Sequence, residues 1–211
     1  DTKAFYKSVS VALIHAGKGK IVTFGIVPTH ANTGYGYIQA ETTSDEYNST
    51  VMNVKCFKEK PDKKLADVYL LENDKSRDNN LTLRWYWNSG MFVCQAKTLI
   101  DESSIHSSEI LSKVRSSVEK AIYDLDFIRL EGQTFASSPS DSIDYALMEK
   151  SDNVVVVSLD ALWNDIGSWS ALYEIGAKDE NGNVTRGDVK AIDTTNSYIN
   201  ASHHMVALIG V

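Results

Sequence analysis

The sequence predicts an α/β fold followed by a short β-rich element, and three observations support this prediction. Helical patterns alternate along the chain with short, largely apolar runs of the kind that form buried strands, most clearly at 21–27 and 154–159. The chain has 211 residues, 43% of them hydrophobic, which is enough for one sizeable core. After residue 178 the pattern changes to short apolar segments separated by turn signals such as Asn-Gly and Gly-Asp. We therefore expect one domain over 1–178 and a β-rich element over 179–211.

Periodicity and turn residues place the elements of the first half of the chain. Apolar residues at helical spacing predict a helix over 2–16, and β-branched residues predict the strand at 21–27. A proline at its start favours a helix over 61–72, followed by a loop over 73–80 that has no apolar residue. The other expected elements are a strand ending near 41, a loop over 42–50, a strand over 51–57 and one or two strands over 83–93.

The second half of the chain is expected to be mainly helical up to residue 150. A helix begins near residue 97, and an apolar stripe predicts a long helix over 104–124. A helix over 140–150, with Asp141 as its N-cap, precedes the buried strand at 154–159. A short helix over 168–175 follows.

The charge balance limits the classes of partner. The chain has 21 Lys and Arg against 28 Asp and Glu, a formal net charge of −7 at pH 7. Such an acidic protein is poorly matched to nucleic acid or to an anionic membrane, and no apolar run approaches the ~18 residues of a membrane-spanning helix. A small phosphorylated substrate remains compatible, because its site needs only a few local donors. We expect a cytoplasmic protein with no nucleic-acid and no membrane partner.

Several common catalytic motifs are missing, and four other short segments carry chemistry. The chain has no Gly-x-x-x-x-Gly-Lys-Ser/Thr phosphate loop, no Gly-x-Gly-x-x-Gly turn and no Gly-x-Ser-x-Gly elbow. The first informative segment, Thr-Gly-Tyr-Gly-Tyr-Ile at 33–38, is either a turn between strands or a place where a ligand approaches the backbone. The second, Phe-Lys-Glu-Lys-Pro at 57–61, lies where a strand ends and a helix begins. Glu59 could accept hydrogen bonds from sugar hydroxyls and Lys60 could contact a phosphate, or both are solvated charges.

The third and fourth segments place polar groups among apolar ones. Trp-Asn-Ser-Gly-Met-Phe at 87–92 puts Asn88 inside an aromatic strand, where it is either a structural bracket or a ligand contact, since buried polar groups need partners. Trp-Asn-Asp-Ile-Gly-Ser-Trp at 163–169 puts Asp165 between a buried strand and a helix. Its carboxylate could hold Mg²⁺, which prefers hard oxygen ligands, while Ser168 could cap the helix; both interpretations can hold together.

In their order along the chain, these segments resemble the mannose-1-phosphate guanylyltransferases, or GDP-mannose pyrophosphorylases, of the long bacterial type. Two more segments match, Val-Thr-Phe-Gly-Ile-Val-Pro-Thr at 22–29 and Ser-Ile-Asp-Tyr-Ala-Leu-Met-Glu-Lys at 142–150, and the resemblance covers the chain from residue 5 to residue 211. It implies a nucleotidyltransferase fold with a Rossmann-like mixed sheet, present here in part. It also implies the reaction of that family, in which mannose 1-phosphate and GTP give GDP-mannose and pyrophosphate.

The resemblance also implies roles for the candidate site residues. The backbone of Gly36 would contact the sugar, Glu59 would bind sugar hydroxyls, and Lys60 would bind the sugar phosphate. Asp165 would be the ligand of a Mg²⁺ cofactor, and it and Lys60 are the expected catalytic residues. The other residues expected to contact the substrate are Tyr35, Asn88 and Asp144.

The chain departs from this family in one large respect. The Gly-rich nucleotide motif, with its arginine and catalytic lysine, is not found in the 211 residues, and neither is the family's second metal-binding aspartate. We therefore expect the sugar-phosphate part of a catalytic domain, inactive by itself, with homo-oligomer formation left open. Two alternatives also stay open: a non-catalytic sugar-phosphate-binding module, and a glucose-1-phosphate nucleotidyltransferase.

Overall fold

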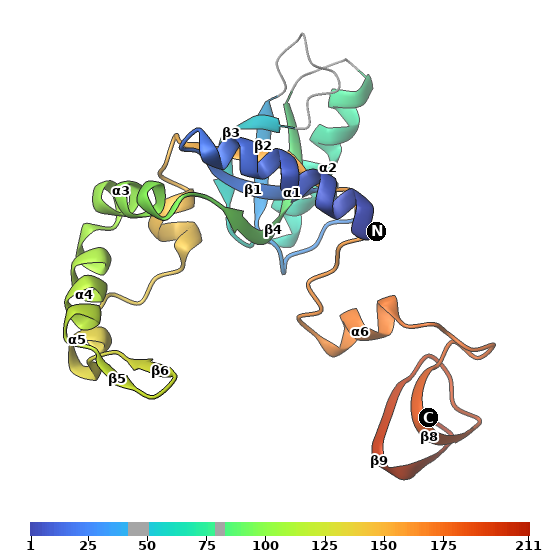
Figure 1. Cartoon of the computed structure of the whole chain (residues 1–211). Coiled ribbons are helices and arrows are strands. Elements are labelled where there is room, and N and C mark those ends of the chain that lie inside the picture. The colour runs from blue at the N-terminus through green and yellow to red at the C-terminus, as the bar shows by residue number, and fades with distance from the viewer. Residues whose placement is uncertain (42–50, 79–82) are drawn as a thin grey trace. The chain divides into compact units, whose positions relative to one another are not determined.

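The computed structural model describes residues 1–41, 51–78 and 83–211 (Figure 1). It divides into two compact units, Asp1–Ala161 and Leu162–Val211, and each is described by itself. The α/β class is confirmed, and the C-terminal part is β-rich as expected. The division falls before the expected boundary at residue 178, and the assignment of 1–178 to one functional domain remains a prediction. The loop expected over 42–50 lies outside the described residues.

A mixed sheet of five described strands forms the first unit and closes on itself. In the order of pairing, the strands are β1 (Ile21–Ile26), β4 (Leu83–Val93), β2 (Tyr37–Glu41), β3 (Val51–Lys58) and β7 (Val154–Ser158). β1 and β7 are parallel, and the other described pairs are antiparallel. A short pairing of β3 with β7 closes the sheet into a barrel, a feature that the sequence does not predict. The residues expected as one or two strands over 83–93 form one strand.

The core of the first unit lies inside this sheet. β1 is buried along its whole length, as its largely apolar, β-branched sequence predicts. Core side chains come from all five strands and from a π-helical turn, η1 (Asp144–Met148); they include Ile21, Ile38, Met52, Phe57, Tyr86, Leu147 and Val156. Gly25 is required by this packing, because a Cβ there would lie 2.7 Å from Val156 Cγ2 and 2.9 Å from Tyr86 Cβ. The predicted helix over 140–150 is wrong in its length, because that segment forms only the five-residue π-helical turn η1.

Two helices cover the sheet (Figure 1): α1 (Thr2–Gly17) contacts β1, β4 and β7, and α2 (Lys63–Asp78) contacts β4. The sequence predicts a loop over 73–80, but α2 continues to Asp78, so the prediction is wrong for residues 73–78. Residues 79 and 80 lie outside the described part. The reason is the buried side chain of Asn73. Its carboxamide accepts a hydrogen bond from Trp85 N at 2.7 Å and donates one to Trp85 O at 2.9 Å, so a polar residue joins α2 to the backbone of β4.

The single helix expected over 104–124 is wrong. The segment contains α3 (Ala96–His106), α4 (Ser108–Glu119) and the start of a hairpin of β5 (Ile122–Asp124) and β6 (Phe127–Arg129), which α5 (Gly132–Ala136) follows. At Ser107 the backbone leaves the helical region, with φ −146° and ψ 46°, and α3 ends there. Ser117 Oγ donates to Glu131 O at 2.9 Å and ties the hairpin back to α4. The apolar residues at helical spacing over 104–124 therefore do not pack together against a single hydrophobic core.

In the second unit, a short helix is followed by two parallel strands. α6 (Trp169–Ile175) precedes β8 (Val184–Ile192) and β9 (Tyr198–Ile209), which pair along most of their length. The fully buried carboxamide of Asn183 donates to Thr194 O at 2.8 Å and accepts from Ser197 N at 3.0 Å. It thereby joins the segment before β8 to the segment between β8 and β9. Within the described residues, no helix combines the length and the apolar character that crossing a membrane requires.

Replacing Gly25 by alanine tests the packing of the barrel. A Cβ at this position meets Val156 and Tyr86 below normal contact distance, so Gly25→Ala is expected to lower the free energy of unfolding by about 1–3 kcal/mol. Urea denaturation followed by circular dichroism measures the change. The control is Gly17→Ala, where a Cβ meets nothing within 4 Å and helix propensity favours alanine. Equal stability of the two variants would contradict the assigned packing.

Candidate functional site

Five of the residues expected at the site meet at one end of the barrel. Gly36 directly precedes β2, Glu59 and Lys60 directly follow β3, and the antiparallel pairing of Tyr37 with Lys58 brings these strand ends together. The other two contributors are Asn88 on β4 and Asp144 at the start of η1. We call Gly36, Glu59, Lys60, Asn88 and Asp144 the strand-end cluster.

Gly36 holds the centre of the cluster because a side chain does not fit there. A Cβ on Gly36 would lie 2.6 Å from Glu59 Oε2 and 3.4 Å from Asn88 Cβ. The carbonyl oxygen of Gly36 also accepts a hydrogen bond from Asn88 N at 2.7 Å. The Gly36 backbone therefore lies close to the Glu59 carboxylate of the chain itself, and a ligand contact at the Gly-Tyr-Gly segment stays a prediction.

Asn88 lies at a β-bulge. Thr23 and Gly25 of β1 pair with Phe92 and Asn88 of β4, so two steps along β1 correspond to four along β4. Gly90 has φ +72°, a conformation that favours glycine. Bulges re-aim side chains beside functional sites, and this one places the Asn88 carboxamide within 3.2 Å of Asp144 Oδ1, to which its Nδ2 donates.

Asp144 is half-buried beside a second carboxylate. Burial raises the pKa of the Asp144 carboxyl, and the neighbouring Glu59 carboxylate raises it further. The ammonium of Lys60 and the hydrogen bond from Asn88 lower this pKa and oppose the rise. Two adjacent carboxylates are costly to a fold but are well suited to accept hydrogen bonds from the hydroxyls of a sugar.

The Glu59–Lys60 pair combines a buried carboxylate with an exposed ammonium. The two charges lie 3.2 Å apart, with 11% of the Glu59 side chain exposed and 61% of the Lys60 side chain exposed. Lys60 has φ +41°, in the left-handed region that non-glycine residues adopt rarely, and such strain is concentrated at functional sites. The Glu59 backbone N–H also donates to Glu149 Oε1 at 3.3 Å, a contact that the sequence did not suggest.

Tyr35 belongs to an aromatic group next to the cluster. Its ring lies edge-on to Trp87 at 5.1 Å, and the His30 ring meets Trp87 in the same way at 5.0 Å. Trp87 Nε1 is buried, and it has no hydrogen-bond partner in the part of the chain that the structure describes. Sequence analysis did not select Trp87 or His30, although both lie in or beside segments that it singled out.

Asp165 lies in the second unit, in a loop of local side-chain-to-backbone hydrogen bonds. Its Oδ1 accepts from Gly167 N at 3.2 Å, and Asn164 Oδ1 accepts from Ile166 N at 2.8 Å. Ser168 caps α6 by accepting from Ala171 N at 3.1 Å, as predicted.

The exposed Asp165 carboxylate is a hard oxygen donor. The described residues contain no group of three or more His, Cys, Asp or Glu suited to a metal. A single carboxylate is compatible with a Mg²⁺ ion that takes most of its ligands from substrate phosphates and water, and Mg²⁺ binding at Asp165 stays a prediction.

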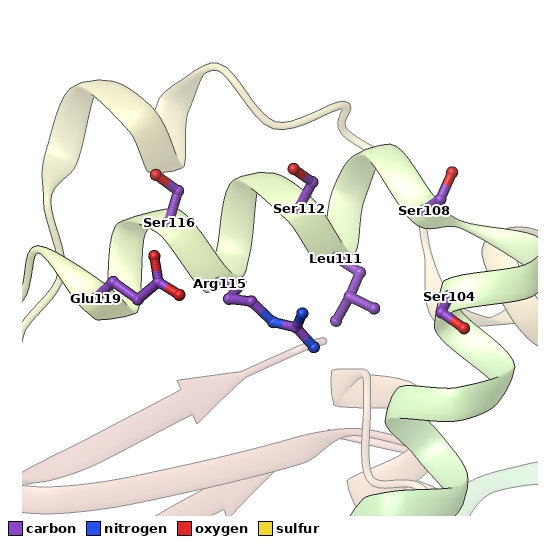
Figure 2. A pocket seen from close by; sticks show the side chains of 7 residues that line it. All are labelled: Ser104, Ser108, Leu111, Ser112, Arg115, Ser116 and Glu119. Atoms are coloured by element: carbon purple, nitrogen blue, oxygen red, sulfur yellow. The ribbon is translucent and has the colours of Figure 1, made fainter.

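A separate groove lies on α3 and α4 and includes none of the predicted site residues. It has a volume of about 310 Å³ and is lined by Ser104, Ser108, Leu111, Ser112, Arg115, Ser116 and Glu119. Figure 2 shows Ser108, Ser112 and Ser116 in a row along α4. The one cation among these lining residues, Arg115, is exposed.

The fold and the strand-end cluster define an α/β protein in which two carboxylates, an amide and a lysine meet at the strand ends. The nucleotidyl transferase family model matches residues 2–182, and the chain belongs to this family. Over its described length the structure is also similar to the crystal structure of mannose-1-phosphate geranyltransferase from Thermus thermophilus, with a TM-score of 0.77 and 26% identity over 100% of this chain and 56% of that one.

Curated relatives agree with the resemblance. Mannose-1-phosphate guanylyltransferase of Escherichia coli is 41% identical over 99% of this chain and 43% of its own length. Xanthan biosynthesis protein XanB of Xanthomonas campestris pv. campestris is 42% identical over 100% of this chain and 42% of its own length. The structure of mannose-6-phosphate isomerase from Helicobacter pylori also matches, with a TM-score of 0.61 and 33% identity over 78% of this chain and 59% of that one. The chain thus spans less than half the length of these two curated relatives.

Replacing Asp144 by asparagine separates the cost of its charge from its hydrogen bond. The pKa of Asp144 is higher in the folded state than the ordinary aspartate value of about 3.9. Between the unfolded and the folded pKa, the folded state therefore binds more protons than the unfolded state. Stability falls as the pH rises through this range. Asp144→Asn removes the charge and keeps an acceptor for Asn88. It is expected to raise the melting temperature at pH 7, with the gain shrinking as the pH falls toward 4.

The control for this comparison is Asp141→Asn at an exposed aspartate three residues away, where a change within about 0.5 kcal/mol is expected. Thermal denaturation of the three proteins at several pH values provides the measurement. A gain for Asp144→Asn that does not depend on pH would show that the buried charge is not its cause.

Proposed function

We propose that this chain carries the mannose 1-phosphate side of a guanylyltransferase that joins mannose 1-phosphate to GTP in the cytoplasm, with GDP-mannose and pyrophosphate as products. The observation that carries the proposal is the strand-end cluster, which combines partly buried hydrogen-bond acceptors for sugar hydroxyls with an exposed lysine beside them. The names of the curated relatives support the choice of mannose 1-phosphate over other sugar phosphates.

The sugar would be held through its hydroxyl groups. The Glu59 and Asp144 carboxylates would accept hydrogen bonds from hydroxyls, and the backbone N–H of Gly36 and the Asn88 amide would donate to hydroxyl oxygens. Glycine at position 36 lets a ligand reach both the backbone and the Glu59 carboxylate, since a Cβ would occupy that space. Each of these fixing contacts would contribute roughly 1–3 kcal/mol, with the contacts to the charged carboxylates at the upper end of that range.

Lys60 would act on the phosphate. An oxygen of mannose 1-phosphate attacks the α-phosphorus of GTP, the P–O bond to the β-phosphate breaks, and pyrophosphate leaves. Both reactants are anions, so charge repulsion is a main part of the barrier, and positioning and electrostatic stabilisation lower it. Lys60 would exchange its contact with Glu59 for the sugar phosphate, orienting the attacking oxygen and screening its charge. Asp165 would hold Mg²⁺, which when bound neutralises phosphate charge.

Lys60→Ala tests this role directly. Isothermal titration calorimetry of the chain with mannose 1-phosphate is expected to show binding to the wild-type chain, with glucose 1-phosphate bound more weakly. Loss of a charge-assisted contact should weaken the affinity of Lys60→Ala for mannose 1-phosphate by about 10- to 100-fold.

The matched control for Lys60→Ala is Lys63→Ala. Lys63 is equally exposed, lies three residues away and pairs with Asp67 on its own helix. Its substitution should leave the affinity unchanged. Unchanged affinity of Lys60→Ala would remove Lys60 from the site, and absence of binding by the folded wild-type chain would contradict the proposed function of this chain.

A second test addresses Asp165 and the metal. If Asp165 holds Mg²⁺, then Mg²⁺ should strengthen mannose 1-phosphate binding in the wild-type chain, and Asp165→Ala should abolish this strengthening without lowering the melting temperature. In the intact parent protein the same substitution should abolish turnover. Asp188→Ala, at an exposed aspartate of the same unit, is the control. An effect of Mg²⁺ that survives Asp165→Ala would contradict the metal assignment.

A further inference from the structure

Thr23 is a buried hydroxyl residue that no part of the proposed mechanism uses. It lies on β1 with no exposed surface, among the apolar residues of that strand. Its Oγ1 lies 3.0 Å from Asn88 Oδ1 and 3.3 Å from Met91 O. A hydroxyl has one hydrogen to donate, and the nearer acceptor is the Asn88 carboxamide.

The Asn88 carboxamide has hydrogen-bond donors beside its oxygen and an acceptor beside its nitrogen. Its oxygen accepts from Thr23 Oγ1 and from Gly90 N, the latter at 3.2 Å. Its nitrogen donates to Asp144 Oδ1 at 3.2 Å. With the amide turned over, an NH₂ group would face the N–H of Gly90, and an oxygen would face the Asp144 carboxylate. Both contacts would be repulsive, so Gly90 and Asp144 set the orientation of the amide. The Thr23 hydroxyl, which can donate or accept, holds the amide oxygen in place in that orientation.

We propose that Thr23 is a positioning residue that anchors the Asn88 carboxamide in the orientation that Gly90 and Asp144 set, with its NH₂ group facing the Asp144 carboxylate of the strand-end cluster. The inference rests on the proposed function, because it assigns the amide a donor role toward a sugar hydroxyl. It adds Thr23 to the residues of the site, although Thr23 itself would not touch the ligand.

The chemistry of the amide explains why orientation matters. Nδ2 carries two hydrogens, and Asp144 takes one of them. The second can be donated to a sugar hydroxyl oxygen, while the neighbouring carboxylates accept the hydrogens of the sugar hydroxyls. A turned amide would present an oxygen instead, and the site would then contain acceptors without the matching donor.

The test compares Thr23→Val with Thr23→Ser in the full chain. Valine has nearly the same shape as threonine but lacks the hydroxyl, whereas serine keeps it. Titration with mannose 1-phosphate is expected to show an affinity about five- to tenfold weaker for Thr23→Val and within about twofold of wild type for Thr23→Ser. In an Asn88→Ala background, Thr23→Val should cause no further loss, because the group that it positions is absent.

A purely structural role for Thr23 would give a different result. It would lower the melting temperature of Thr23→Val without changing the affinity of the folded protein, or it would weaken binding equally in the Asn88→Ala background. Either outcome would overturn the inference.

The NMR signals of the Asn88 side-chain NH₂ group supply a readout that needs no ligand. These signals should move in Thr23→Val and stay in place in Thr23→Ser. If the wild-type chain does not bind mannose 1-phosphate, the proposed function fails, and these signals alone test whether Thr23 anchors the amide. Unchanged signals in Thr23→Val would overturn the inference whatever the binding result.

Discussion

The central constraint in this molecule is a carboxamide inside a buried, aromatic strand. A buried polar group without partners destabilises a fold, and Asn88 obtains most of its partners from elements distant in the sequence. β1 supplies Thr23, the segment before β2 supplies the Gly36 carbonyl, and η1 supplies Asp144. The Gly36 carbonyl accepts from the backbone N–H of Asn88, and the bulge in β4, with Gly90 in a left-handed conformation, lets the carboxamide reach Thr23 and Asp144. The same hydrogen bonds therefore hold the barrel together and assemble the strand-end cluster.

The cluster also contains features that do not serve stability. Two carboxylates lie close together, the pKa of one of them is raised by burial, and Lys60 adopts a strained backbone conformation. A protein under selection for stability alone would not be expected to keep them together, whereas a ligand rich in hydroxyls and carrying a phosphate would satisfy them. The Glu59–Lys60 ion pair fits this view, because a buried carboxylate and an exposed cation are held ready for different parts of one ligand.

Much of this could be predicted from the sequence, since apolar runs and short motifs report local chemistry. The buried strands β1 and β7, the helix α1 and the cap at Ser168 follow from local patterns. One error occurs where a distant contact overrides the local pattern, since Asn73 extends α2 by bonding to β4. Another occurs at Ser107, where the backbone leaves the helical region and divides the expected long helix. The roles of Thr23 and Trp87 were missed because only the fold brings Thr23 to Asn88 and Trp87 to Tyr35.

The central claim is that the strand-end cluster is the place where the chain binds a sugar phosphate. The most direct test is to titrate the ¹⁵N-labelled chain with mannose 1-phosphate and follow the backbone amide signals. The account predicts that the largest shifts fall on Gly36, Glu59, Lys60 and Asn88. Shifts confined to the groove on α3 and α4, or no shifts in a demonstrably folded sample, would contradict it.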